Sequence, residues 1–263
     1  MRVLIINLPS AKERMAFQAE QMRRLGLEFT RIGAVLADQA DAMRSRDYWF
    51  TWQRPLRNNE KACMLSHVEA WRFVVAANEP MLILEDDALL SRRLPALLQS
   101  LAGRADLDLL NLEVRGKRKL LGREPMRGLS EVYRLYQSGG GAAAYVLWPA
   151  GARKLLADTE LRAGLADAVL SAASYLEKYQ TTPAYALQLD MCGHYDLPAP
   201  LQTVSSIGDG GKPDYNIPLY LFLRLKRRRV SEQLGLFFGR IFRFFVARRR
   251  FIEVRAEDFS FPA

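Results

Sequence analysis

Three consecutive acids follow an apolar run in the stretch MLILEDDALL, residues 81–90. The run predicts a buried strand that ends at Glu85, Asp86 and Asp87. Alternation along a strand places Glu85 and Asp87 on one side and Asp86 on the other. Carboxylates there repel one another and are costly to desolvate, unless a cation lies between them. A pair of hard oxygen ligands suits Mg²⁺ or Mn²⁺, to which a phosphate ligand adds further oxygens.

The acids have a second interpretation that involves no metal. Asp86 or Asp87 would then cap a helix that follows the strand, by accepting hydrogen bonds from its free backbone N–H groups. The spacing alone does not separate the two interpretations. Open parallel sheets bind ligands at the carboxyl ends of their strands, so in either case the acids lie at the edge where a site is expected.

The sequence around the acids alternates apolar runs with helix-like stretches, which predicts an α/β domain with a largely parallel sheet flanked by helices. The predicted strands are residues 3–8, 28–35, 80–87 and 107–114, with a short one ending near residue 148, and the predicted helices are residues 10–26, 59–78 and 149–164. Ser10 is the expected N-cap of the first helix, with Glu13 as capping-box partner and Gly26 as its stop. Residues 115–128 predict an exposed basic loop or short hairpin. The glycines at residues 139–141 predict a tight turn or a close approach to a ligand.

The composition is that of a folded globular protein, with 49% hydrophobic residues among 263. The opening residues lack the features of a signal peptide. No segment is uninterruptedly apolar over the roughly 18 residues that mark a membrane-spanning helix. Cys63 and Cys192 lie far apart without metal-ligand spacing and are expected to be reduced core residues. These features predict a cytoplasmic location.

The net charge of +9 lies in one segment, because residues 224–250 hold ten basic residues and a single acid, Glu232. On a helical wheel one face of this segment is apolar, and Gln233, Arg240 and Arg243 fall on the opposite face. The apolar face consists of Leu234, Phe237, Phe238, Ile241, Phe242 and Phe245. We therefore predict a catalytic domain at residues 1–216 and a basic amphipathic helical tail at residues 217–263 that binds an anionic membrane surface. The alternatives are a helix packed on the domain and a homodimer contact. A nucleic-acid arm is not expected, since it has no need of so many phenylalanines.

The stretches NNEKACMLSHVEAW and PMLILEDDALL together resemble the signature of glycosyltransferase family 25, the lipooligosaccharide and lipopolysaccharide galactosyltransferases of Gram-negative bacteria. Three further stretches agree in order, namely VLIINLPSAKER, IGAV and GGGAAAYVLWPAGARKLL. The resemblance covers roughly residues 1–206 in patches. It implies a GT-A type fold and transfer of a sugar from a nucleotide diphosphate donor.

The resemblance also implies roles for particular residues. Asp87 matches the metal ligand, with Glu85 beside it, and Glu85 or Asp86 matches a carboxylate near the donor ribose or the water shell of the metal. The remaining donor-binding candidates are Asn7, Arg14, Glu60 and His67.

An inverting transfer needs a carboxylate to take the proton of the acceptor hydroxyl. The stretch LADAVL resembles the family's Pro-Val-Asp segment, which makes Asp167 the candidate base, although Leu165 and Ala166 replace the Pro and the Val. Asp190 is the alternative base. His194 is a weaker candidate for a third metal ligand, since imidazole suits Mn²⁺.

The acidic triplet and the resemblance together imply a Mn²⁺- or Mg²⁺-dependent inverting glycosyltransferase, and the resemblance indicates galactose as the sugar. This enzyme would move a sugar from a UDP-sugar to a lipid-linked lipopolysaccharide or lipooligosaccharide core, as a peripheral protein on the cytoplasmic face of the bacterial inner membrane. UDP-glucose and a UDP-N-acetylhexosamine are the next donor candidates. The alternatives are a membrane- or nucleic-acid-binding protein whose acidic turn is structural, and a metal-dependent phosphotransferase. The sequence does not indicate an oligomeric state.

Overall fold

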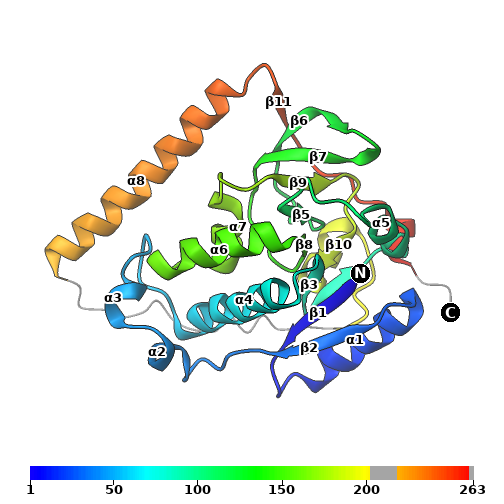
Figure 1. The fold of residues 1–263 in the computed structure, drawn as a ribbon, viewed down its shortest axis with the longest axis horizontal. Helices are drawn as coiled ribbons and strands as arrows, with labels where there is room; N and C mark the ends of the chain where they lie inside the picture. Colours follow the sequence, from blue (N-terminus) through cyan, green and yellow to red (C-terminus); the bar gives the residue numbers. More distant parts are fainter. Residues whose placement is uncertain (202–217, 261–263) are drawn as a thin grey trace.

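The computed structural model describes residues 1–201 and 218–260, and in this part of the chain a nine-stranded sheet forms the centre of the molecule (Figure 1). Its strands are β1 (Arg2–Asn7), β2 (Phe29–Gly33), β3 (Met81–Glu85), β5 (Leu109–Asn111), β6 (Lys119–Met126), β7 (Leu129–Gln137), β8 (Ala144–Leu147), β9 (Lys178–Thr181) and β11 (Ala247–Arg250). The α-helices are α1 (Lys12–Leu25), α2 (Ala40–Met43), α3 (Arg46–Trp49), α4 (Asn58–Ala77), α5 (Leu94–Ser100), α6 (Pro149–Leu161), α7 (Ala166–Ala172) and α8 (Leu219–Phe242). Short 3₁₀ helices span Leu189–Tyr195 and Ala256–Phe259.

The strand order is β11-β6-β7-β9-β5-β8-β3-β1-β2. β1 pairs in parallel with both β2 and β3, and β5 pairs in parallel with β9. β8 lies between β3 and β5 and is antiparallel to both. β7 and β11 also run against their neighbours, so β7, β8 and β11 oppose a direction that all other strands share. The predicted α/β fold with a largely parallel sheet is confirmed, and it is consistent with the GT-A type.

Helices cover both faces of the sheet because the strands are apolar on both sides. Val3 and Ile5 of β1 pack with residues of α1 and α5 on one face. Leu4 and Ile6 face the other way and pack with α4, α6 and α7. Trp71 of α4 is fully buried in this second layer. The acidic end of β3 therefore emerges from a core that is packed on both sides.

The strand that follows the acids tests the interpretation of the triplet as a helix cap. Asp86 and Asp87 form a turn, after which the chain continues as β4 (Ala88–Leu90). β4 leaves the large sheet and pairs antiparallel with β10 (Ala186–Gln188). No helix follows the acids directly, so the interpretation of the triplet as a helix cap is wrong.

Two local predictions need correction. Ser10 does not cap α1, because Ala11 is its N-cap and the amide of Ala11 donates to the carbonyl of Leu8 in the preceding turn. The stop at Gly26 is confirmed, with a left-handed φ of 65°. The predicted exposed segment at residues 115–128 is buried at residues 119–122, because β6 lies between β7 and β11, whereas Lys117 and Arg118 are exposed.

The C-terminal segment is divided between a peripheral helix and the sheet. α8 runs along the edge of the molecule, and the chain then returns as β11, which pairs with β6 (Figure 1). Arg248–Arg250 therefore belong to an edge strand, and the expectation that all the basic charge lies outside the fold is wrong. The predicted boundary between residues 216 and 217 lies outside the described residues. Among the described helices, none has the length and apolar character needed to cross a bilayer.

Candidate active site

The register of β1 and β3 brings Asn7 and Arg14 to the second acid. Ile6 pairs with Glu85, so the residues that follow them, Asn7 and Asp86, lie at the same edge of the sheet. Asn7 Nδ2 donates to Asp86 Oδ2 at 2.7 Å, and Arg14 forms an ion pair with Asp86 Oδ1 at 3.1 Å. Asp86 is buried. Three residues predicted to bind the donor thus form one cluster, in which both oxygens of Asp86 have partners.

Two buried glutamines of α1 fix the backbone of the acidic turn. Gln18 Nε2 donates to the carbonyls of Asp86 and Ala88, at 3.1 and 2.8 Å. Gln21 Nε2 donates to the same carbonyl of Ala88, and its Oε1 accepts from the amide of Leu90. Because buried backbone groups must find partners, these bonds replace the ladder bonds that end with β3. These hydrogen bonds from α1 fix the position of the turn.

Glu85 lies at the end of a buried chain of hydrogen bonds. Trp71 Nε1 donates to the hydroxyl of Tyr145 at 2.8 Å, Tyr145 lies 2.8 Å from His67 Nδ1, and His67 Nε2 lies 3.1 Å from Glu85 Oε1. A carboxylate can only accept, so a neutral His67 carries its proton on Nε2, and its Nδ1 accepts from Tyr145. Gln188 Nε2 donates to the other oxygen of Glu85 at 3.2 Å. The chain orients Glu85 at the edge of the sheet.

Cys63, His67 and Glu85 place one ligand atom each within 4.8 Å of one another, which is close enough to hold a metal ion. Both nitrogens of His67 are engaged, by Tyr145 and Glu85. Burial and the charge of Glu85 raise the pKa of the Cys63 thiol well above its usual range, whereas metal binding needs the thiolate. In this arrangement the group is better suited to positioning Glu85 than to binding a metal.

The buried carboxylate of Asp87 is poorly compensated by its surroundings. Its Oδ1 is buried and has no hydrogen-bond partner in the part of the chain that the structure describes. Burial, followed by the charges of Glu85 and Asp86, raises the pKa of Asp87 to about 7, while Arg14 lowers it. A divalent cation next to Glu85 and Asp87 would remove this penalty, and two carboxylates are the ligands that Mg²⁺ or Mn²⁺ prefers. The predicted pair Glu85 and Asp87 therefore fits a metal.

Two adjoining cavities open beside the acids. The first has a volume of about 540 Å³ and is lined by all three acids together with Arg14, His67 and Asp190. We call it the Asp87 cavity. The second has a volume of about 200 Å³ and is lined by Glu60, Gly141, Leu165 and Asp167, among others. We call it the Asp167 cavity. Four residues line both, namely Cys63, Glu85, Arg115 and Gln188.

The two candidate bases lie in different cavities. Asp167 lies in the first turn of α7, half-buried, with no hydrogen bond or ion pair among the described residues. The backbone passes close by, since a Cβ on Gly140, at a φ of +106°, would lie 3.0 Å from Asp167 Oδ2. Asp190 forms an ion pair with Arg115 at 2.9 Å. Asp167 is therefore the candidate base without an ion pair among the described residues, and its charge acts, after that of Glu60, to raise the pKa of Arg54.

Of two further candidates, Glu60 lines one of the cavities and His194 lines neither. Glu60 lines the Asp167 cavity and not the Asp87 cavity, and it accepts from Arg54 at 2.7 and 2.8 Å and from the amide of Arg57 at 2.9 Å. Burial alone would raise the pKa of Glu60, but the bonds from Arg54 and Arg57 lower it overall. His194 is exposed and packs against Tyr195, and it lines neither cavity.

Sequence reasoning did not identify a fourth carboxylate, Glu113. It is fully buried, its Oε2 accepts from the amide of Ala143, and its Oε1 has no partner. Burial and the charge of Glu85 raise the pKa of Glu113 to about 8. Gly141 has a φ of +107°, and a Cβ there would lie 2.0 Å from Glu113 Oε1, so only glycine fits. The glycine-rich stretch thus lies over Glu113 and forms part of the wall of the Asp167 cavity.

The fold and the site define an α/β protein with a carboxylate-lined cleft at the carboxyl ends of its strands. Residues 1–168 match the family model of glycosyltransferase family 25, described as an LPS biosynthesis protein. No curated protein matches the chain. Among solved structures, the inositol-1-phosphate CTP transferase from T. maritima is similar over 77% of this chain and 73% of its own, with 13% identity and a TM-score of 0.36.

The family match extends over more than half of the chain and includes Glu85, Asp86, Asp87 and Asp167. The chain belongs to glycosyltransferase family 25. It is a glycosyltransferase of lipopolysaccharide biosynthesis, which confirms the resemblance found in the sequence.

Proposed function

We propose that this protein transfers galactose from UDP-galactose to a lipopolysaccharide or lipooligosaccharide core, by a metal-dependent and inverting reaction. The observation that carries the proposal is Asp87, whose buried Oδ1 has no partner beside the carboxylate of Glu85. Buried carboxylates normally have partners. A divalent cation is the partner that the chemistry of this pair selects, and family membership supports a nucleotide-sugar donor beside it.

The Asp87 cavity suits the donor. Its acids lie at the carboxyl ends of the strands, and Asn7 and Arg14 hold Asp86 in place. A metal ion held by Glu85 and Asp87 would stabilise the negative charge that develops on the diphosphate leaving group. Arg115 lines both cavities and places a guanidinium at their junction.

The Asp167 cavity suits the acceptor hydroxyl. Asp167 forms no ion pair or hydrogen bond among the described residues, so its carboxylate is available to take a proton. The walls shared by the two cavities, at Glu85 and Gln188, bring a donor in one next to an acceptor in the other. Attack from the side opposite the diphosphate inverts the configuration at the transferred sugar.

Release of UDP from UDP-galactose by the purified protein tests the proposal. We expect slow hydrolysis with Mn²⁺, faster release when a lipopolysaccharide core is added, and loss of both on chelation with EDTA. Transfer of phosphate instead of sugar, or release that persists in EDTA, would contradict the proposed reaction. Parallel assays with UDP-glucose and UDP-N-acetylglucosamine identify the donor sugar.

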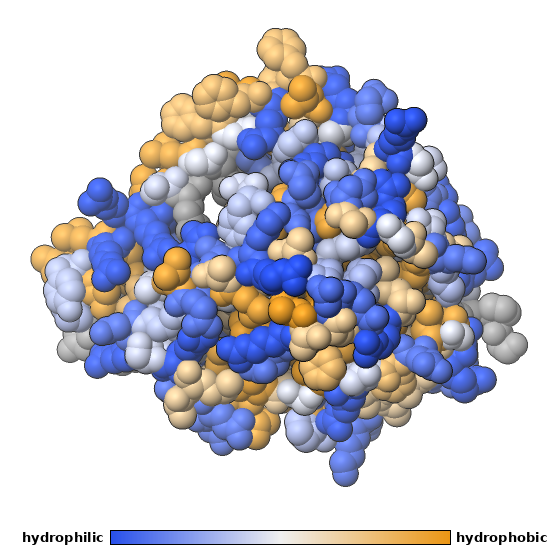
Figure 2. Space-filling model, viewed as in Figure 1, coloured by the Kyte–Doolittle hydropathy of each residue, from blue (hydrophilic) through white to orange (hydrophobic). Residues whose placement is uncertain are grey.

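We also propose that α8 holds the protein on the cytoplasmic face of the inner membrane, where a lipid-linked acceptor would lie. Figure 2 shows apolar side chains along the outer edge of this helix, at the upper left of the view. Those of the predicted face that lie in α8 are at least half exposed, namely Leu234, Phe237, Phe238, Ile241 and Phe242, and Phe245 is exposed in the turn after the helix. Arg224 and Lys226 are exposed near the start of the helix. Basic residues near an anionic leaflet contribute on the order of 1 kcal/mol each, and buried apolar groups add attraction that salt does not screen.

A substitution at three positions of α8 tests membrane binding without removing the edge strand β11. Phe237→Ser, Ile241→Ser and Phe242→Ser together should reduce sedimentation with phosphatidylglycerol vesicles by at least about tenfold at high salt. The parent should bind less as salt rises but keep a residual affinity. Leu161→Ser, at an exposed position of α6, serves as the matched control. If light scattering shows a dimer that the triple variant dissociates, α8 is a subunit contact and the membrane proposal fails.

A further inference from the structure

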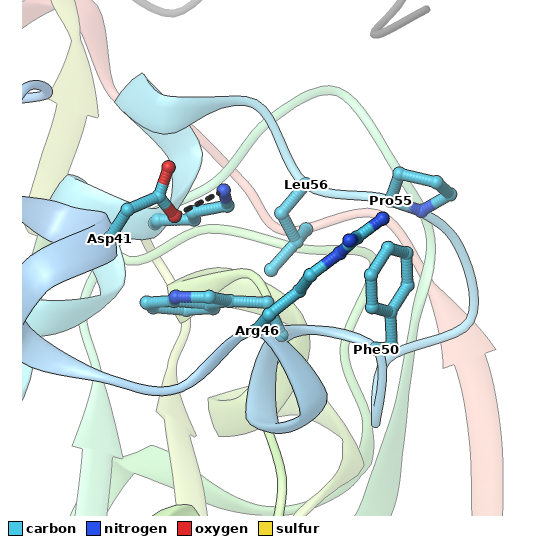
Figure 3. A pocket seen from close by; sticks show the side chains of 7 residues that line it. Asp41, Arg46, Phe50, Pro55 and Leu56 are labelled. Carbon is cyan, nitrogen blue, oxygen red and sulfur yellow. Dashed lines mark hydrogen bonds and ion pairs between the residues drawn. The ribbon is translucent and has the colours of Figure 1, made fainter. Parts of the chain in front are cut away.

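A third cavity, with a volume of about 270 Å³, lies between the short helices α2 and α3 and the start of α4. Figure 3 shows the side chain of Arg46 extending between Leu56 and Phe50 towards Pro55, with Asp41 at the opposite end. We call it the Trp49 cavity, because Trp49 also lines it. Its volume is below the range of roughly 300–1,000 Å³ typical of drug-sized ligands, so it suits a single small ring.

The walls of the Trp49 cavity combine aromatic faces with cations. Arg46 lies over the ring of Phe50 at 5.6 Å, and Lys61 Nζ lies over the ring of Trp49 at 5.6 Å. Lys61 is buried and forms an ion pair with Asp41 at 2.6 Å. Such a wall offers an apolar surface to the carbon face of a sugar, and charged groups to its hydroxyls.

Two groups in this cavity lack a hydrogen-bond or ion-pair partner among the described residues. Trp49 is 4% exposed, and its Nε1, which can only donate, is buried without a hydrogen bond to that part of the chain. Arg46 has no ion-pair partner in the part of the chain that the structure describes. The positive charges of Arg46 and Lys61 exceed the one carboxylate of Asp41. A ligand that accepts a hydrogen bond and carries a negative charge would satisfy both groups.

The first turn of α4 contributes to the walls of both the Trp49 cavity and the Asp167 cavity. Glu60 lines one and Lys61 lines the other, and they are consecutive residues. Trp49 also packs in one apolar cluster with Leu165, which lines the Asp167 cavity. A sugar chain whose terminal hydroxyl lies at Asp167 could therefore extend towards the Trp49 cavity.

We propose that the Trp49 cavity binds an anionic sugar unit of the acceptor, one that carries a carboxylate or a phosphate. This inference rests on the proposed function for its acceptor assignment, but the binding site itself does not. The ring lies against Trp49 and Phe50, an oxygen accepts from Trp49 Nε1, and the anionic group meets Arg46.

Titration of the ¹⁵N-labelled protein tests the site directly, since each of the four tryptophans gives one indole N–H signal. The signal of Trp49 is assigned from Trp49→Phe. Glucuronic acid and glucose 6-phosphate are the probes for the carboxylate and the phosphate, and glucose is the neutral control. We expect both acids to shift the Trp49 signal at lower concentration than glucose does, and the weaker of the two identifies the less suitable anion.

The matched variants are Arg46→Gln in the cavity and Arg153→Gln on the surface of α6. Arg46→Gln should weaken binding of the acids by about fivefold or more, and Arg153→Gln should leave it unchanged. A Trp49 signal that none of the probes moves, or that moves equally in Arg46→Gln and the parent, overturns the proposal.

Transfer assays separate this inference from the proposed function. Arg46→Gln should raise the KM for the lipopolysaccharide core by a similar factor and leave the KM for UDP-galactose and the hydrolysis of donor unchanged. An unchanged acceptor KM contradicts the acceptor assignment. Absence of donor hydrolysis in the parent contradicts the proposed function, whereas the shift of the Trp49 signal still decides the binding site.

Discussion

The Asp87→Asn variant is expected to keep its fold and to lose metal-dependent binding of the donor. The substitution removes the negative charge of Asp87, whose buried Oδ1 has no hydrogen-bond partner among the described residues, and with it one of two proposed metal ligands. Loss of residues that only support metal ligands typically costs 10–100-fold, so we expect transfer to fall by about a hundredfold or more. Calorimetric titration of UDP-galactose with and without Mn²⁺ measures the effect, and unchanged Mn²⁺-dependent affinity would exclude Asp87 as a ligand.

Cys63→Ser is the comparison that separates the two possible metal groups. If the metal lay among Cys63, His67 and Glu85, this variant would lose Mn²⁺ as Asp87→Asn does. We expect it to keep Mn²⁺-dependent donor binding, because the hydrogen bonds of His67 and the raised pKa of the thiol favour the carboxylates.

The stability of the metal-free protein gives an independent control on the fold. The pKa of Asp87 is raised to about 7 in the folded state from an ordinary value of 3.8. Between these values the folded state binds more protons than the unfolded state, so this group lowers stability as the pH rises through the interval. Asn carries no charge, and Asp87→Asn in EDTA at pH 8 should therefore melt no lower than the parent. A large drop in melting temperature would show that Asp87 is structural.

The local pattern of apolar and polar residues was enough to predict the elements that carry the acids. The strand at residues 80–87, the helix at residues 59–78 and the helix after Pro149 all form, because each has a strong period and clear ends. The proximity of Asn7, Arg14 and Asp86 could be predicted as well, since parallel pairing brings the ends of β1 and β3 to the same edge of the sheet.

The remaining site residues depend on pairings between distant segments. Gln188 reaches Glu85 because β10 pairs with β4, where Gln188 lies opposite Ala88. The sequence predicts that Arg115 is a solvated basic residue. In the structure it follows β5 and lines both cavities. Glu113 shows no periodic signal, because its burial comes from Gly141 passing over it. No local window of the sequence contains this information.

The C-terminal segment also depends on a pairing that its local sequence does not predict. The stretch at residues 247–250 has three consecutive arginines, which favours a solvated segment. As β11 it occupies the edge of the sheet, where alternate side chains can remain in water while the backbone pairs with β6. Arg250 lies 3.9 Å from the centre of the Tyr133 ring. A truncation near residue 216 would remove this strand as well as α8, which is why substitutions within α8 are the cleaner test.

The Asp167→Asn variant is expected to bind donor normally and to transfer sugar at least about a hundredfold more slowly, because a general base contributes roughly 10²–10⁴-fold. Asp167 lines the cavity next to Glu85 and Arg115 but makes no hydrogen bond or ion pair among the described residues. The substitution therefore removes a proton acceptor without breaking a structural contact. Single-turnover transfer to a lipopolysaccharide core measures the chemical step, and donor titration confirms that binding is intact.

Asp190→Asn is the matched control, because Asp190 is the alternative base and lines the other cavity. Its carboxylate is paired with Arg115 at 2.9 Å, so removing its charge should alter the position of Arg115 and affect the KM for the donor more than the chemical step. If the metal stabilises the diphosphate leaving group, hydrolysis of the donor by water depends less on a general base than transfer to the acceptor does. We therefore expect Asp167→Asn to reduce the rate of transfer more than the rate of hydrolysis. Transfer at the parental rate in Asp167→Asn, together with its loss in Asp190→Asn, would move the base to Asp190 and reverse the assignment of the two cavities.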